Sequence, residues 1–175
     1  MARWKAELRE WAEAFIFAVV IVAVLHAFVV ANYMIDGDSM LPTLHHGERV
    51  LFYRLGQRLG IGPERGDIIF FEHAGGTQRD LVKRVIGVAG DVVEIRDGKV
   101  FVNGAPVVEP YLASATLGSY GPITVEEGTV FVLGDNRNLS MDSRDPSVGL
   151  IPLKRIYGRA IFVYWPLSAW RWLGR

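Results

Sequence analysis

An apolar run near the N-terminus constrains the fold more than any other feature of the chain. Residues 14–31 read AFIFAVVIVAVLHAFVVA, in which His26 is the only strongly polar residue. As a helix, a run of this length crosses most of a hydrocarbon core about 30 Å thick. Aromatic residues flank the run, and cations precede it at Arg3, Lys5 and Arg9. The sequence therefore predicts a cytoplasmic segment over 1–13 and a transmembrane anchor over 14–32, with the N-terminus in the cytoplasm.

Two other interpretations of this run are a cleaved secretory signal and a buried core helix. A secretory signal should end in a small-x-small cleavage site, and VVANYMIDG offers only a poor one. The run is also longer than the roughly 7 to 15 residues usual for the apolar part of such a signal. Both points favour the uncleaved anchor.

Composition excludes several functional classes. The 175 residues carry a formal net charge of +0, which is not the electrostatic footprint of a nucleic-acid binder. Cysteine is absent, so the chain has neither a disulfide framework nor a thiolate metal site. One main domain is expected for this length.

Beyond Tyr33 the apolar segments are short and rich in β-branched and aromatic residues. Examples are RVLFYRL, DIIFFEH, DLVKRVIGV, DVVEIRDGKVFVNG, GTVFVLGD and GRAIFVYW. Asp97-Gly98, between two alternating runs, is a strong hairpin signal. Segments 54–66 and 104–128 are expected to be loops. The fold class is therefore mainly β, with an antiparallel β-sheet domain over 33–175 after the anchor.

The C-terminal segment YWPLSAWRWLGR contains Trp165, Trp170 and Trp172. Such a cluster is suited to a lipid interface beside the anchor. Aromatic residues that close one end of the β core would give the same pattern.

Ser39 is a candidate nucleophile, and His45 and His46 are the nearest bases in the sequence. No G-x-S-x-G elbow surrounds the serine, and the histidines lie in a polar loop segment, so a Ser-His-Asp triad is not supported. Neither zinc nor calcium ligand spacing is present, and we expect no metal and no cofactor.

Lys83 is a different candidate base. Strict alternation in RDLVKRVIGV places Lys83 with Leu81 and Val85, and Arg84 on the other face. One of the two cations must then lie on an apolar surface. Desolvation lowers the pKa of a lysine and makes it a general base near neutral pH. A strand-edge lysine that reaches water is the alternative reading of this stretch alone.

Four motifs follow the apolar run in order: SMLPTL (39–44), RGDIIFF (65–71), KRVIGVAGD (83–91) and GDNRNLSMDSR (134–144). Behind an N-terminal anchor, they resemble the bacterial type I signal peptidases, which are membrane-anchored serine proteases with a Ser-Lys dyad. VNGAPVVEPYL (102–112) is similar to the linking hairpin of that family. The segment between Lys83 and Gly134 is short, so the chain looks like a minimal form.

The resemblance implies roles for single residues. Ser39 is implied to be the nucleophile and Lys83 the general base. Ser140 matches the serine that hydrogen-bonds and orients the lysine. Asp142 and Arg144 match an ion pair that supports the site.

The oxyanion hole is the main departure from the family. Many members use a serine hydroxyl two residues before the nucleophile, and this chain has Gly37 there. The second donor must then be a backbone N–H, a water or nothing, and one such donor is worth roughly 3 kcal/mol of barrier. We expect Gly37→Ser to preserve or raise turnover.

The resemblance also implies the substrate, a secreted preprotein whose signal peptide has small residues at the first and third positions before the scissile bond. The cleavage region would bind as an added strand. Its side chains would enter an apolar pocket formed by Ile35, Met40, Leu44, Leu81 and Val82.

Partners implied by the resemblance are signal peptides, the lipid bilayer and the secretion translocon. The catalytic domain would lie on the outer face of the bacterial cytoplasmic membrane. Two alternatives are a specialised maturation peptidase, or self-cleaving repressor-like protease, of the serine–lysine class and a membrane-tethered β domain that binds without catalysis.

Overall fold

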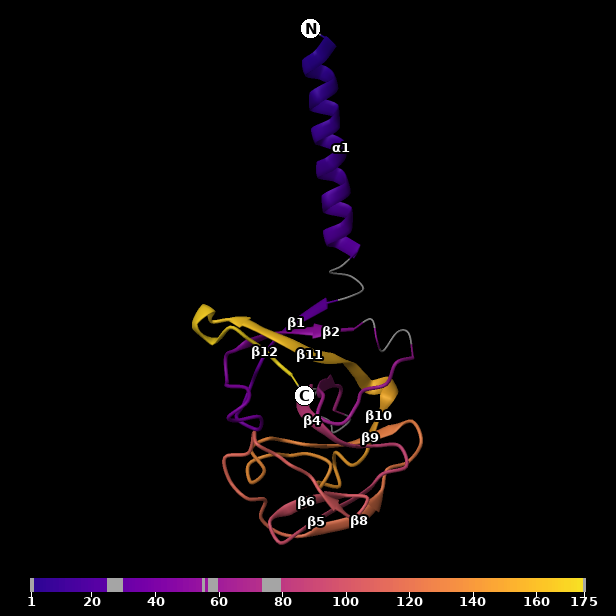
Figure 1. Cartoon of the computed structure of the whole chain (residues 1–175), viewed down its shortest axis with the longest axis vertical. Helices are drawn as coiled ribbons and strands as arrows, with labels where there is room; N and C mark the ends of the chain where they lie inside the picture. Colours follow the sequence, from indigo (N-terminus) through magenta and orange to yellow (C-terminus); the bar gives the residue numbers. More distant parts are fainter. Residues whose placement is uncertain (1, 25–29, 55, 57–59, 74–79, 175) are drawn as a thin grey trace.

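The computed structural model describes residues 2–24, 30–54, 56, 60–73 and 80–174. A helix, α1 (Ala2–Val24), precedes a β-rich part made of two antiparallel sheets (Figure 1). The predicted mainly β class with antiparallel pairing is confirmed.

The larger sheet has eight strands. Its order is β1 (Val30–Met34), β2 (Arg49–Tyr53), β11 (Ile156–Trp165), β3 (Ile68–Phe71), β4 (Leu81–Val88), β9 (Thr129–Leu133) and β10 (Ile151–Pro152), with β12 (Arg171–Trp172) paired to β11. Two short 3-10 helices, η2 (Leu153–Arg155) and η3 (Leu167–Ala169), precede and follow β11. Strands from both ends of the chain therefore form one sheet.

The smaller sheet has the order β7 (Ala105–Pro106), β6 (Lys99–Val102), β5 (Val92–Arg96) and β8 (Tyr120–Thr124). The predicted hairpin at Asp97-Gly98 is confirmed, and both residues have the positive φ that a tight hairpin turn requires, 53° and 75°. Strand β8 lies within the segment that we expected to be a loop. It is an edge strand that contains Pro122, a residue confined to sheet edges because it lacks a backbone donor.

Three apolar clusters fill the space around the sheets. Both faces of β3 are buried, so Ile68 and Phe70 pack into one cluster and Ile69 and Phe71 into another. The third cluster lies between the sheets and joins side chains of β4 and β9 to those of β5 and β6. The central strands β3 and β4 are thus covered on both sides.

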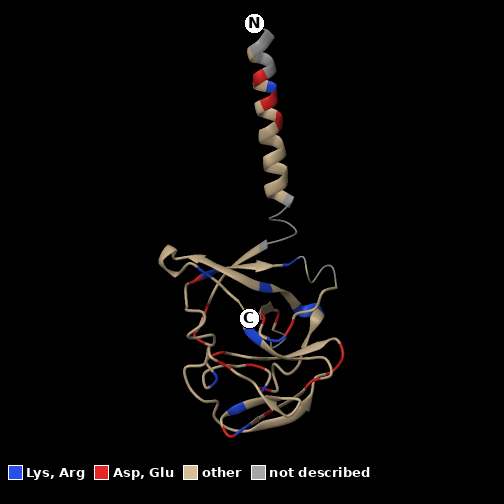
Figure 2. Cartoon of the chain, viewed as in Figure 1, with Lys and Arg blue, Asp and Glu red and all other residues tan. Residues whose placement is uncertain are grey.

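The exposed apolar side chains of α1 lie outside these clusters. Phe15, Phe17 and Val22 are among them, and α1 carries no charge after Glu13 (Figure 2). Within the part of the chain that the structure describes, no helix meets the length and hydropathy of a membrane span. Residues 25–29 of the expected anchor (14–32) lie outside the described residues, and residues 30–32 pair with β2 as strand residues rather than extending a helix.

The tryptophans of the C-terminal segment do not close the core. Trp165, Trp170 and Trp172 are 50%, 59% and 77% exposed. Phe162 contacts the rings of Trp170 and Trp172 at the surface of β11. The alternative in which these residues seal one end of the β core is therefore wrong.

We expect Gly87→Ala to destabilise the contact between the sheets. An added Cβ would lie 2.6 Å from Cγ2 of Val93 and 3.1 Å from Cγ2 of Val125. Such overpacking costs about 1–3 kcal/mol. Urea unfolding of the detergent-solubilised protein measures the loss, and Gly62→Ala, where no atom lies within 4 Å, is the matched control. Equal unfolding free energies for the two variants would contradict this packing.

Candidate active site

Ser39 lies in the loop that joins β1 to β2. Backbone hydrogen bonds from Ile35 N to Glu48 O (2.8 Å) and from Gly47 N to Ile35 O (2.9 Å) close the base of this loop. Met40 and Leu44 are buried in the core on either side of a turn in which Leu44 N donates to Met40 O. The apolar side chains thus fix the loop, and Ser39, immediately before Met40, stays partly exposed.

Lys83 reaches Ser39 from β4. Its Nζ lies 2.7 Å from Ser39 Oγ and 3.0 Å from the backbone oxygen of Val82, and both of these partners are uncharged. Only 2% of Lys83 is exposed. Desolvation by burial lowers its pKa from 10.5 to about 8, although the charges of Asp142 and Asp135 act in the opposite direction. The amine therefore holds a readily lost proton beside a serine hydroxyl.

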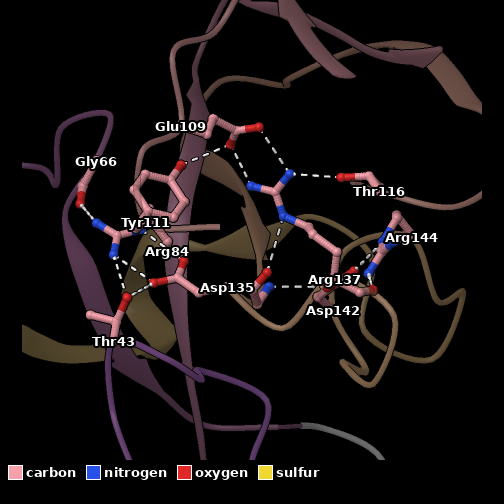
Figure 3. Close-up of polar contacts among 11 residues, drawn as sticks. Thr43, Gly66, Arg84, Glu109, Tyr111, Thr116, Asp135, Arg137, Asp142 and Arg144 are labelled. Atoms are coloured by element: carbon pink, nitrogen blue, oxygen red, sulfur yellow. Dashed lines mark hydrogen bonds and ion pairs between the residues drawn. The ribbon is translucent and has the colours of Figure 1, made fainter. Parts of the chain in front are cut away.

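Arg84, the next residue on β4, is buried too but is paired with a carboxylate. Its Nε and Nη2 donate to the two oxygens of Asp135 at 2.8 and 2.6 Å (Figure 3). Burial alone would lower the pKa of Arg84, but the hydrogen bonds and charge of Asp135 outweigh it and raise that pKa. Both adjacent cations are thus buried, and their different partners give them opposite pKa shifts.

The turn after β9 holds the backbone of the serine loop. Asn136 N donates to Ser39 O at 3.0 Å, and its Nδ2 donates to Asp38 O at 3.1 Å. Thr43 Oγ1 donates to Asp135 Oδ2 at 2.5 Å. Gly134 permits this close approach, because a Cβ there would lie 2.5 Å from Ser39 O.

Asp142 and Arg144 form the ion pair expected from the sequence. Arg144 Nε and Nη2 donate to the Asp142 carboxylate at 2.8 and 2.9 Å. Asp142 also accepts a hydrogen bond from Gly134 N at 3.0 Å, and Arg144 donates to the backbone oxygen of Arg137. The pair therefore braces both ends of the turn over residues 134–144.

Together these groups suit acyl transfer. A serine hydroxyl within hydrogen-bond reach of an amine of lowered pKa has the geometry of an activated nucleophile and its base. Among the described residues, no cluster of three metal-ligating side chains is present.

Comparisons with known proteins identify the family of the chain. The sequence pattern of the family described as "Signal peptidase, peptidase S26" matches residues 8–165. The chain belongs to the signal peptidase family. It is 40% identical to signal peptidase I of Bacillus licheniformis over 176 residues, which cover 94% of this chain and 92% of the relative.

Other relatives in the signal peptidase family are similarly close. Signal peptidase I S of Bacillus subtilis is 39% identical, with 95% of this chain and 94% of the relative covered. Signal peptidase IB of Staphylococcus aureus is 39% identical, with 96% and 95% covered. A solved signal peptidase I of Enterococcus faecalis, 33% identical, aligns over 55% of this chain and 95% of its own with a TM-score of 0.49.

Ser140 does not form the hydrogen bond expected from the family resemblance. Its Oγ is buried, and no hydrogen-bond partner for it is found within the described ranges. The side chain packs against Gly134, since a Cβ at that glycine would collide with Ser140 Oγ and Cβ. The structure thus places Ser140 beside the turn that binds the Ser39 backbone, with its hydroxyl unused.

Gly37 and the histidines differ from the sequence expectations in one respect. His45 and His46 have exposed side chains, and neither takes the place of Lys83 at Ser39 Oγ. However, His46 Nδ1 accepts the Gly37 N–H at 3.1 Å, so this backbone donor is engaged. Gly37 has φ of +102°, where a residue with a side chain is strained. The expectation that Gly37→Ser preserves turnover conflicts with this backbone.

Four of the five residues predicted for the substrate pocket lie in one cluster, namely Ile35, Met40, Leu44 and Val82. Leu81 lies apart, because it packs against the cluster on the other face of β3 and β4. Strand alternation explains the difference, since Leu81 and Val82 are consecutive residues of β4.

Sequence reasoning missed most of the supporting contacts of the serine loop. Arg84, Thr43 and Asn136 make them. Arg84 and Asp135 are 51 positions apart, so no local pattern reveals their pairing. One signal was available, because two adjacent cations in an apolar strand require that at least one finds a buried partner.

We expect the rate of peptide-bond cleavage to fall at acid pH through a group with a pKa of about 8. We expect the neutral amine of Lys83 to act as the base, so protonation below this pKa should remove it, and kcat/KM should drop about tenfold per pH unit there. Cleavage of a preprotein between pH 6 and 10 measures the profile, with circular dichroism as the control for folding. A rate that stays level from pH 6 to 8, or still rises steeply at pH 10, would contradict a desolvated Lys83.

Proposed function

We propose that the protein is a membrane-associated serine endopeptidase that removes N-terminal signal peptides from secreted preproteins. Ser39 is the nucleophile and Lys83 the general base. The observation that carries the proposal is the 2.7 Å contact of the buried Lys83 Nζ with Ser39 Oγ. The names of the relatives support the substrate class.

The chemistry follows from the dyad. Neutral Lys83 takes the hydroxyl proton as Ser39 Oγ attacks the scissile carbonyl carbon, and a tetrahedral oxyanion forms. The resulting ammonium then gives its proton to the leaving nitrogen, so the C–N bond breaks and an acyl-enzyme remains. Lys83 next takes a proton from the water that attacks the ester, and it returns this proton to Ser39 Oγ as the ester C–O bond breaks. The signal peptide leaves with a new carboxyl group, and the dyad is restored.

In this proposal the oxyanion accepts a hydrogen bond from one identified donor, the backbone N–H of Ser39. The Gly37 N–H is occupied by His46 Nδ1, so it does not serve as a second donor in this arrangement. The backbone N–H of Asn136 donates to the backbone oxygen of Ser39. This contact helps to keep the neighbouring backbone N–H groups in a fixed orientation.

We assign supporting roles to the turn over residues 134–144. Asp142 and Arg144 hold Gly134 and the carbonyl of Arg137. Ser140 lies next to Gly134, and its hydroxyl has no hydrogen-bond partner among the described residues, so in this proposal it is available to the lysine.

Substrate binds in this proposal as an extended strand near Ser39. Ile35, Met40, Leu44 and Val82 belong to one apolar cluster. Met40 follows Ser39 in the sequence and Val82 precedes Lys83, so in this proposal the cluster forms the pocket for the small side chains of the substrate. Leu81 is not part of this pocket, because it packs on the other face.

Membrane attachment is the second part of the proposal. The family is membrane-associated in bacteria. Between Glu13 and Val24 the helix α1 is uncharged and has exposed apolar side chains, and apart from His26 the sequence stays apolar to Ala31. We assign this stretch to the bilayer, with the N-terminus in the cytoplasm and the exposed tryptophans of the C-terminal segment at the outer interface. Contact with the secretion translocon stays a prediction.

We expect Ser39→Ala to abolish preprotein cleavage and Lys83→Ala to lower kcat by roughly 10²- to 10⁴-fold. The exposed residues Ser168 and Lys154 provide matched controls as Ser168→Ala and Lys154→Ala, which should cleave at the parent rate. Mass spectrometry of the products locates the cleaved bond. Equal cleavage by Lys83→Ala would refute the dyad, and no cleavage by the parent enzyme would favour a binding domain.

We expect Val20→Arg to weaken membrane attachment, because an arginine in the middle of a spanning helix costs about 2.5–3.5 kcal/mol. Carbonate extraction of membranes that contain the full chain measures the retained fraction. Leu8→Arg, in the charged first half of α1, is the matched control and should stay in the pellet. Identical retention of the two variants would contradict a spanning role for this part of α1.

A further inference from the structure

We propose that Glu109 and Tyr111, in the loop between β7 and β8, are positioning residues for cleavage. They hold two buried arginines, Arg84 and Arg137, which fix the turn that binds the Ser39 loop. The inference rests on the proposed roles of Ser39 and Lys83. It also gives the smaller sheet a role in catalysis, because a loop between two of its strands carries Glu109 and Tyr111.

Arg137 is a buried cation whose charge is met by Glu109. Its side chain has no exposed surface, and the Glu109 side chain is 6% exposed. Nη1 donates to Glu109 Oε2 and to Thr116 Oγ1, both at 3.0 Å, and Nη2 donates to Glu109 Oε1. Both partners come from the loop between β7 and β8, so that loop is bound to the turn after β9 (Figure 3).

Tyr111 connects the same carboxylate to Arg84. Its hydroxyl donates to Glu109 Oε1 at 2.8 Å, and its ring centroid lies 3.9 Å from the guanidinium carbon of Arg84. Burial and the charge of Glu109 raise the pKa of Tyr111, so the hydroxyl keeps its proton as a donor. Glu109 thus orients the ring that covers Arg84.

Both arginines contact the segment 134–136, which binds the serine loop. Arg137 Nε donates to Gly134 O at 3.1 Å, and Arg84 binds the Asp135 carboxylate. The following residue, Asn136, donates from its backbone to Ser39 O. A series of three noncovalent contacts therefore joins Tyr111 or Glu109 to the backbone of the nucleophile's loop, and the last of the three is the hydrogen bond from Asn136 to Ser39.

The same contacts have an electrostatic consequence at Lys83. The negative charge of Asp135 favours the ammonium form of Lys83 and opposes the effect of burial. Arg84, when held against Asp135, neutralises part of that charge. Loss of the Tyr111 ring would loosen Arg84, so Arg84 would neutralise less of the Asp135 charge. The pKa of Lys83 would then rise.

An exposed group of the same chemistry lies on the smaller sheet and gives a matched control. Arg96 lies over the ring of Phe101 at 4.1 Å and pairs with Glu94 at 3.3 Å. The side chain of Arg96 is 48% exposed, so its contacts are screened by water and contribute little. Phe101→Leu and Glu94→Gln remove comparable groups without touching the active site.

The experiment compares Tyr111→Leu, Tyr111→Phe and Phe101→Leu in cleavage of a purified secreted preprotein by the full chain in detergent. We expect Tyr111→Leu to lower kcat roughly 3- to 30-fold with KM unchanged within about twofold. Its acid limb should move to higher pH by at least about 0.3 unit, so part of the rate returns at high pH. Tyr111→Phe keeps the ring and should lose only about two- to fivefold in kcat. Phe101→Leu should match the parent enzyme in all three quantities.

Three results would overturn the proposal. One is a Tyr111→Leu enzyme with the parent kcat and pH profile. Another is a lower rate with an unmoved acid limb, which indicates only a smaller folded fraction. The third is a raised KM at constant kcat, which indicates substrate contact.

If Tyr111→Leu does not fold, Tyr111→Phe decides, and a kcat equal to that of the parent overturns the proposal. Lys83→Ala, assayed in parallel, keeps the two proposals distinguishable. Its full activity would refute the dyad whatever the Tyr111 variants do, whereas its inactivity beside a fully active Tyr111→Leu would refute only the positioning role.

Discussion

The contrast between two neighbouring cations on β4 governs the rest of the site. Arg84 and Lys83 are both removed from water, which is costly for any charge. The ion pair with Asp135 offsets this desolvation for Arg84, whereas Lys83 contacts an uncharged hydroxyl and a backbone carbonyl. The pKa of Arg84 is therefore raised and that of Lys83 is lowered to about 8. A single strand thus provides a fixed positive charge and, beside it, a base.

This contrast requires a rigid frame, because a loose loop would admit water and restore the ordinary lysine pKa. Three separate parts of the chain supply it. Arg171 of β12 donates to the Glu48 carboxylate and to Thr43 O, which holds the far side of the serine loop. The turn after β9 holds the near side through Asn136. The smaller sheet contributes through the loop that carries Glu109 and Tyr111.

The sequence was sufficient for the features that depend on local chemistry or on motif order. Alternation and the Asp97-Gly98 pair predicted the β class and one hairpin, and the SMLPTL and KRVIGVAGD motifs predicted that Ser39 and Lys83 would meet. The pocket prediction grouped Leu81 with Val82 because both match pocket positions of the family. These residues are consecutive on a strand, so their side chains lie on opposite faces. Strand β8 was missed because Gly121-Pro122 reads as a turn, although proline is compatible with a sheet edge.

Contacts between distant segments were beyond the sequence for a physical reason. Arg84 and Asp135 are 51 positions apart, and Arg137 and Glu109 are 28 apart, so neither pair leaves a periodic trace. The direction of the Ser140 hydroxyl, which has no partner in the described part of the chain, and the Gly37–His46 contact are both set only when the chain folds.

Direct titration of Lys83 tests the central claim most closely. Lysine-selective ¹³Cε NMR of the full chain in detergent micelles follows each amine, with Lys99 and Lys154, which are exposed, as internal references. The account predicts a Lys83 midpoint at about 8, well below the roughly 10.4 of an unperturbed lysine in a peptide. A Lys83 midpoint at the unperturbed value would contradict a desolvated base at Ser39.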